Sequence, residues 1–172
     1  MPTTFDTDLA NLERRYLAWS RELHPDYFQL RSPEDQRLSL SLSAALNDAY
    51  NTLKDPFRRA EYLLWLLGGP SASEHRGMPE GFLEDVLELR MEIEELVEEG
   101  RAGSPRAEEL LQRLEAERCK AMDNVSDSFR ELEKQKAAKP PAEALRILRS
   151  QLNTVKYYDG LLRELEQALV DH

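Results

Sequence analysis

The sequence predicts an all-α protein in two parts, a helical hairpin followed by a three-helix bundle. Apolar residues recur at helical spacing along the chain, and strand-like alternation is missing. The composition is rich in Leu, Glu, Arg and Ala and contains only seven Gly among 172 residues, which is typical of helical proteins. A Gly/Pro/Ser-rich stretch at residues 68–73 marks a boundary. We therefore expect a first domain at residues 1–67, a linker at 68–79 and a second domain at 80–172.

The first part contains two long helices with a short loop between them. The first helix covers about residues 8–23 and ends near His24, because Pro25 disfavours helix at the residue before it. Ser32 and Pro33 are a favoured pair for starting the second helix. A shorter helix follows Asp55-Pro56. The apolar residues expected to be buried are Leu12, Tyr16, Trp19 and Leu23 in the first helix, and Leu38, Leu42, Ala45, Leu46, Ala49 and Leu53 in the second.

The second part contains three helices, at about residues 80–99, 104–138 and 142–170. A turn at residues 100–103 and the Pro140-Pro141 pair separate them, so we expect an antiparallel bundle. The first of these helices carries two apolar stripes, which indicate either burial against two neighbours or one face left for a partner. The expected core stripe is Phe82, Val86, Leu89, Ile93, Leu96 and Val97, and the second stripe is Leu83, Leu87 and Met91.

Charge and cysteine content exclude several classes of protein. A net charge of -10 argues against nucleic acid and anionic membranes as partners. No apolar run is long enough to span a bilayer, and the N-terminal residues do not resemble a signal or transit peptide. The single cysteine, Cys119, is expected to be a small core residue, and a chain with one cysteine suits a reducing compartment. We expect a cytoplasmic protein.

Catalytic and metal-binding patterns are missing from the sequence. The three histidines, His24, His75 and His172, share no helical face with a second ligand type at metal spacing. There is no Gly-rich phosphate loop and no convergence of acids, bases and nucleophiles. We therefore expect no enzymatic activity, no cofactor and no metal.

The triplet His24-Pro25-Asp26, placed between two antiparallel helices of which the first has exposed arginines, resembles the loop of a J-domain. The resemblance implies docking on the ATPase domain of a seventy-kilodalton heat-shock chaperone and stimulation of its ATP hydrolysis. A basic helix would steer association with an acidic partner, and a proline-stiffened loop would bind with little ordering cost. The implied chaperone-binding residues are His24, Pro25, Asp26, Arg14, Arg15 and Arg21.

The remaining sequence is similar to the HscB family of J-domain co-chaperones. The runs that carry this resemblance are LNDAYNTL at 46–53, Asp55-Pro56, RAEYLL at 59–64, and FL at 82–83 leading into LELR at 87–90. The resemblance implies two partners, an HscA-like chaperone and an IscU-like iron–sulfur scaffold protein that binds the C-terminal three-helix domain. The implied scaffold-binding residues are Leu83, Leu87, Glu88, Arg90, Glu95 and Tyr157.

Two alternatives stay open at the level of sequence. One is a generic J-protein with a different client, and the other is a structural helical adaptor in which the His-Pro-Asp triplet is incidental. Stimulation of a chaperone ATPase separates the adaptor from both J-protein hypotheses, and binding of a cluster scaffold separates the two J-protein hypotheses.

Overall fold

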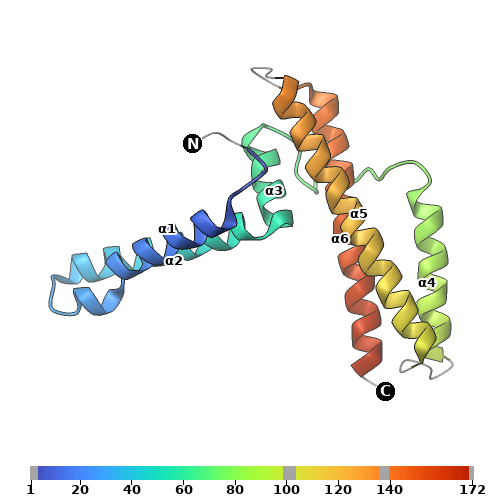
Figure 1. Ribbon diagram of the computed structural model, residues 1–172, viewed down its shortest axis with the longest axis horizontal. Helices are drawn as coiled ribbons and strands as arrows, with labels where there is room; N and C mark the ends of the chain where they lie inside the picture. Colours follow the sequence, from blue (N-terminus) through green and yellow to red (C-terminus); the bar gives the residue numbers. More distant parts are fainter. Residues whose placement is uncertain (1–3, 99–103, 136–139, 171–172) are drawn as a thin grey trace. The chain divides into compact units, whose positions relative to one another are not determined.

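A computed structural model describes residues 4–98, 104–135 and 140–170 of the chain (Figure 1). The described residues form six α-helices and one short 3-10 helix, which confirms the all-α prediction. They divide into two compact units, Met1–Tyr62 and Leu63–His172. The domain borders expected from the sequence, after residues 67 and 79, remain a prediction. The expected turn at residues 100–103 lies outside the described residues.

The first unit is built on an antiparallel hairpin of α1 (Leu9–Glu22) and α2 (Pro33–Lys54), with the 3-10 helix η1 (Pro25–Phe28) between them (Figure 1). The Asp8 carboxylate caps α1 by accepting a hydrogen bond from the Asn11 amide at 3.0 Å. The Ser32 hydroxyl caps α2 by accepting from the Asp35 amide at 3.2 Å. Both helices therefore start at residues whose side chains satisfy otherwise unpaired backbone amides.

A narrow seam joins α1 to α2. The rings of Tyr16 and Tyr50 stack with their centroids 4.1 Å apart, and the Tyr16 hydroxyl donates to the Asn47 side-chain oxygen at 2.8 Å. Nearer the loop, Ser39 is fully buried and its hydroxyl donates to the Leu23 carbonyl oxygen at 2.7 Å. The hairpin is thus held by aromatic stacking at one end and hydroxyl–carbonyl bonds at the other.

The buried stripe expected for α2 was wrong. Leu38 is 57% exposed, Leu42, Ala45 and Ala49 are also exposed, and on α1 Trp19 is 56% exposed. A contact between two helices buries only a narrow seam, so the flanking apolar residues stay in solvent unless a further element covers them. The α2 residues that are at least partly buried are Gln36, Ser39, Ser43, Leu46, Tyr50, Thr52 and Leu53.

Helix α3 (Pro56–Leu66) begins and ends at well-defined caps. The Asp55 carboxylate accepts a hydrogen bond from the Arg58 amide at 2.7 Å. At the other end Gly68 has φ +78°, and the amide of Gly69 donates to the Leu64 carbonyl at 2.9 Å. This left-handed glycine conformation is a common way for a helix to end.

The second unit is an antiparallel bundle of α4 (Phe82–Glu98), α5 (Pro105–Gln135) and α6 (Ala142–Val170), as predicted. In Figure 1, α5 and α6 run side by side as a long pair and the shorter α4 lies along one part of it. Apolar residues at heptad-like spacing fill the core, including Leu114, Val125 and Phe129 of α5 and Leu148, Leu152 and Val155 of α6.

Two expectations for this unit were wrong. Cys119 is exposed and is not a core residue, because the buried face of α5 passes through Leu114, Ala121 and Met122 and leaves position 119 on the solvent side. Val97, expected in the α4 core stripe, is 38% exposed since it lies at the edge of the face centred on Ile93.

The segment before α4, at residues 70–79, is attached to α6. The Asn153 side-chain amide donates to the carbonyl oxygens of His75 and Gly77, each at 3.0 Å. The His75 Nε2 lies 3.1 Å from the Ser150 hydroxyl. The Asn153 side-chain oxygen in turn accepts from Nε of the fully buried Arg149 at 3.0 Å. Part of the stretch expected to be a linker is therefore an ordered edge of the second unit.

No helix in the described part of the chain combines the length and the apolar composition needed to cross a bilayer.

Candidate protein-binding sites

The His24-Pro25-Asp26 loop projects from the end of the hairpin as a compact polar tip. Pro25 starts η1, and the His24 Nδ1 accepts a hydrogen bond from the Asp26 amide at 3.3 Å. The Asp26 carboxylate lies 3.5 Å from the same nitrogen and accepts from the Gln29 side-chain amide at 3.3 Å. The His24 and Asp26 side chains are nevertheless 51% and 71% exposed. Both are therefore ordered by local bonds and available to a partner.

Polar residues of α2 hold both ends of this loop. The Leu23 carbonyl, directly before His24, accepts from the hydroxyls of Ser39 and Ser43 at 2.7 and 2.9 Å. After the loop, the Gln36 side chain donates to the carbonyls of Gln29 and Arg31 at 3.0 and 3.1 Å. The role of Gln36, Ser39 and Ser43 in holding the loop was not predicted from the sequence. The sequence pattern that could have indicated this role is the placement of polar side chains at i, i+3 and i+7, on the face of α2 that contacts α1.

The three arginines of α1 precede this loop in the sequence and are exposed on the surface of the helix. Arg14, Arg15 and Arg21 are all exposed, and Arg14 donates to the Asn11 side-chain oxygen at 3.0 Å. Arg14 and Arg21 are seven residues apart, two helical turns, so they share one face of α1. This face gives the hairpin a local positive charge in an acidic protein.

The second site is an exposed apolar stripe on α4, formed by Leu83, Leu87 and Met91 and called here the α4 stripe. These side chains are 64%, 61% and 55% exposed. The opposite face of α4 is buried in the bundle through residues such as Phe82, Val86 and Ile93. The α4 stripe is thus separate from the core, and three large apolar side chains in one exposed row indicate a binding surface.

Charged residues on both sides of the α4 stripe connect α4 to the rest of the bundle. On one side the Arg90 guanidinium lies 3.8 Å from the Glu164 carboxylate of α6. On the other side the Glu95 carboxylate accepts from Arg106 of α5 at 3.2 Å. Glu88 is exposed and has no ion pair with any residue that the structure describes. The stripe therefore faces outward with a charged rim.

Tyr157 of α6 lies at one end of this surface. Its ring meets the ring of Phe82 edge-on, with 5.7 Å between centroids and an interplanar angle of 90°. Phe82 directly precedes Leu83 in the chain, so the half-buried Tyr157 lies near the N-terminal end of α4, where the α4 stripe begins. The structure thus brings Leu83 and Tyr157, distant in sequence, into one region of the second unit.

Two solved structures share the fold over nearly the whole chain. The chaperone HscB from Vibrio cholerae superimposes with a TM-score of 0.76 and 27% identity, covering 97% of this chain and 91% of that one. The human co-chaperone protein HscB gives a TM-score of 0.78 and 25% identity, covering 99% and 79%. The Co-chaperone protein HscB of Proteus mirabilis is 40% identical over 97 residues. The chain is thus similar to HscB co-chaperones in sequence and in fold.

The sequence match to the curated relatives is shorter than the structural one. The HscB of Proteus mirabilis matches over 56% of this chain and 56% of its own length, and an HscB homolog of Vibrio cholerae matches over 55% and 56%, also at 40% identity. The match thus spans about half the length of these relatives. No family model matches the chain.

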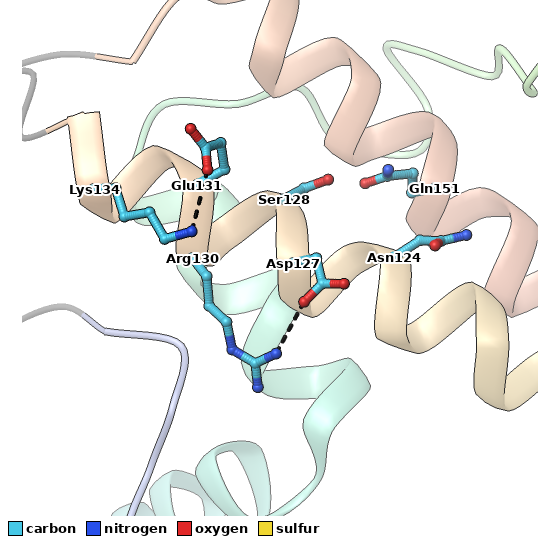
Figure 2. A pocket seen from close by; sticks show the side chains of 7 residues that line it. All are labelled: Asn124, Asp127, Ser128, Arg130, Glu131, Lys134 and Gln151. Atoms are coloured by element: carbon cyan, nitrogen blue, oxygen red, sulfur yellow. Dashed lines mark hydrogen bonds and ion pairs between the residues drawn. The ribbon is translucent and has the colours of Figure 1, made fainter.

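A shallow groove on α5 lacks the features of a binding site. Figure 2 shows its lining residues, in which Arg130 pairs with Asp127 at 3.0 Å and Lys134 pairs with Glu131 at 3.4 Å. These are ordinary i,i+3 surface pairs whose charges balance. Within residues 4–98, 104–135 and 140–170, no group of three His, Cys, Asp or Glu side chains is placed to hold a metal ion.

Proposed function

We propose that the chain stimulates ATP hydrolysis by an HscA-like chaperone of the seventy-kilodalton heat-shock class and delivers to it an IscU-like iron–sulfur scaffold protein. The observation that carries this proposal is the exposed His24-Pro25-Asp26 loop, held at both ends by α2, in a chain that is similar to HscB co-chaperones. We also propose that the chain catalyses no reaction itself, binds no cofactor and acts in the cytoplasm.

The chaperone would dock on the loop and on α1. The loop offers an imidazole and a carboxylate whose positions are set before binding, so little conformational entropy is lost on association. Asp26 is suited to engage an arginine of the chaperone, since a charge-assisted bond to a guanidinium is among the stronger polar contacts. Arg14, Arg15 and Arg21 would increase the association rate with an acidic surface.

The scaffold protein would bind the α4 stripe. Leu83 and Leu87 supply apolar side chains that are already exposed and in register, one turn apart. Glu88, Arg90 and Glu95 form a charged rim, the usual arrangement around the apolar centre of an interface. Tyr157 would extend the apolar area onto α6, and a tyrosine can contribute both ring area and a hydroxyl group.

The chaperone half is tested by the ATPase rate of an HscA-like chaperone with the purified chain. His24→Gln should abolish stimulation and leave helix content and thermal melting unchanged, because His24 is exposed and has no core contacts. Asp48→Asn, on the exposed part of α2 far along the helix from the loop, is the control and should stimulate normally. Full stimulation by the His24 variant would contradict the J-domain assignment.

The scaffold half is tested by calorimetric titration with an IscU-like scaffold protein. Binding supports the proposal. Stimulation of the chaperone without scaffold binding would instead favour a generic J-protein with another client. Neither activity would favour the structural adaptor.

A further inference from the structure

Most basic side chains that the structure describes in the second unit form a hydrogen bond or an ion pair with a neighbour. Eight pair with a carboxylate, from Arg90 with Glu164 to Arg146 with Glu143. Buried Arg149 donates to Asn153, and Arg163 donates to the Asp159 carbonyl. Among the described residues of this unit, only Arg76 and Lys156 have neither a hydrogen bond nor an ion pair, although acidic residues outnumber basic ones.

These two cations line the same cavity. It is a shallow cavity, open to solvent, with a volume of about 300 Å³, and it is bounded by Ala72, Arg76, Met78, Asn153, Lys156 and Tyr157. No carboxylate is among its lining residues, and its exposed wall is mostly apolar. The volume is at the small end of ligand sites, which suits one side chain better than a large ligand. A small apolar cavity with two free positive charges is complementary to an acidic side chain with an aliphatic stem.

The backbone on both sides of Arg76 is held against α6. Asn153 is buried and donates to the carbonyls of His75 and Gly77, the residues before and after Arg76. Asn153, Lys156 and Tyr157 are three to four residues apart on α6 and so share a face. The Arg76 backbone is therefore positioned beside Lys156 before any ligand arrives, which reduces the ordering cost of binding.

The cavity lies near the N-terminal end of α4, where the α4 stripe begins. Tyr157, which the proposed function includes in the scaffold-binding surface, lines the cavity and packs edge-on against Phe82, the residue before Leu83 in the chain. We propose that the cavity accepts an Asp or Glu side chain of the scaffold protein whose apolar residues bind the α4 stripe. The inference rests on the proposed function and adds to it the chemistry of one contact: a carboxylate held by Arg76 and Lys156, with its stem against Met78 and Tyr157.

The first experiment measures scaffold affinity of the full chain by calorimetry at low and high salt. Arg76→Glu and Lys156→Glu should each weaken binding roughly threefold to tenfold at low salt, and the loss should shrink at high salt because partly exposed charges are screened. Lys120→Glu makes the same charge change on the exposed side of α5 and should have little effect. Cavity variants that bind as well as the Lys120 variant would overturn the inference and leave the proposed function standing.

A second experiment tests the cavity without the scaffold protein. An NMR titration of the full chain would use a blocked Leu-Glu-Leu peptide and its Leu-Gln-Leu counterpart. We expect amide shifts at Met78, Lys156 and Tyr157 with the Glu peptide only, and their loss in Arg76→Ala/Lys156→Ala. Equal responses to the two peptides, or none, would overturn the inference. If the cavity selects the Glu peptide but the chain does not bind the scaffold, the carboxylate site stands and the proposed function fails.

Discussion

The hydroxyl of Ser39 donates a hydrogen bond to the backbone carbonyl of Leu23, with 2.7 Å between the two oxygen atoms. Leu23 is the last residue before the His24-Pro25-Asp26 loop, and Ser39 is the residue of α2 that is fully buried. Its bond ties the end of α1 to the second helix at the position where the loop begins. The orientation of the loop thus depends on a side chain sixteen residues away.

We expect Ser39→Ala to destabilise the first unit by about 1 kcal/mol, the usual contribution of such a bond, and to reduce chaperone stimulation as well. The reason is that the Leu23 carbonyl keeps only the Ser43 bond, so the loop is less well ordered. Denaturant unfolding and ATPase rates measure the two effects. Ser41→Ala, at an exposed position of the same helix, should change neither. A folded Ser39 variant with unaltered stimulation would show that this anchor is irrelevant to docking.

Reversing the charges of Arg14 and Arg21 to Glu should slow association with the chaperone and flatten its salt dependence. Exposed charges act mainly on the encounter rate, and they are screened as ionic strength rises. Stopped-flow association over a salt series is the measurement. Arg37→Glu, on α2, is the control for a change in total charge. An association rate that responds equally to all three reversals would argue against α1 as the docking face.

Truncating Leu83 and Leu87 to Ala should affect binding more than folding. Each change should weaken scaffold binding by about 1–3 kcal/mol if the residue is an interface anchor. Leu89→Ala, one helical face away and 8% exposed, is the matched core control and should cost roughly 2–5 kcal/mol of stability. Calorimetric titration and denaturant melts give both quantities. Normal binding by the double variant would place the scaffold site elsewhere.

Asn153→Ala should release residues 75–77 from α6. The variant loses two hydrogen bonds to backbone carbonyls and one from Arg149, at a cost of about 1–3 kcal/mol for the buried groups left unpaired. Limited trypsin digestion should then cut faster after Arg76. Gln151→Ala is the control, because its buried side-chain oxygen has no hydrogen-bond partner in the described structure. Equal cleavage rates in the two variants would mean that Asn153 does not hold the segment.

Glu74 should titrate below the ordinary range of glutamate. Hydrogen bonds from the Ser71 amide and hydroxyl, at 2.8 and 2.7 Å, stabilise its charged form and lower the pKa of its carboxyl. The stabilisation is present above the unfolded-state pKa and is lost as pH falls through the folded one. NMR titration should show this low pKa, and Ser71→Ala should move it upward. A Glu74 pKa that is ordinary in both proteins would contradict the turn at residues 71–74.

Local signals in the sequence were sufficient to predict the elements of the fold. Prolines and capping side chains act on their immediate neighbours, so the ends of α2 at Ser32 and of α6 at Pro141 could be placed without knowledge of the partners. The same holds for the His24-Pro25-Asp26 loop. Helical periodicity was also sufficient to distinguish the α4 stripe from the core residues of α4. The fixed angle between successive residues of a helix determines which side chains share a face.

Burial and long-range contacts were decided only by the tertiary structure. Periodicity identifies an apolar face but not the width of the contact that covers it, which is why Leu38 and Trp19 are exposed although they continue apolar stripes. The attachment of His75 to α6 and the meeting of Arg76 with Lys156 depend on side chains more than seventy residues apart in the chain. No local rule predicts such pairs, since chain folding alone determines which surfaces are brought together.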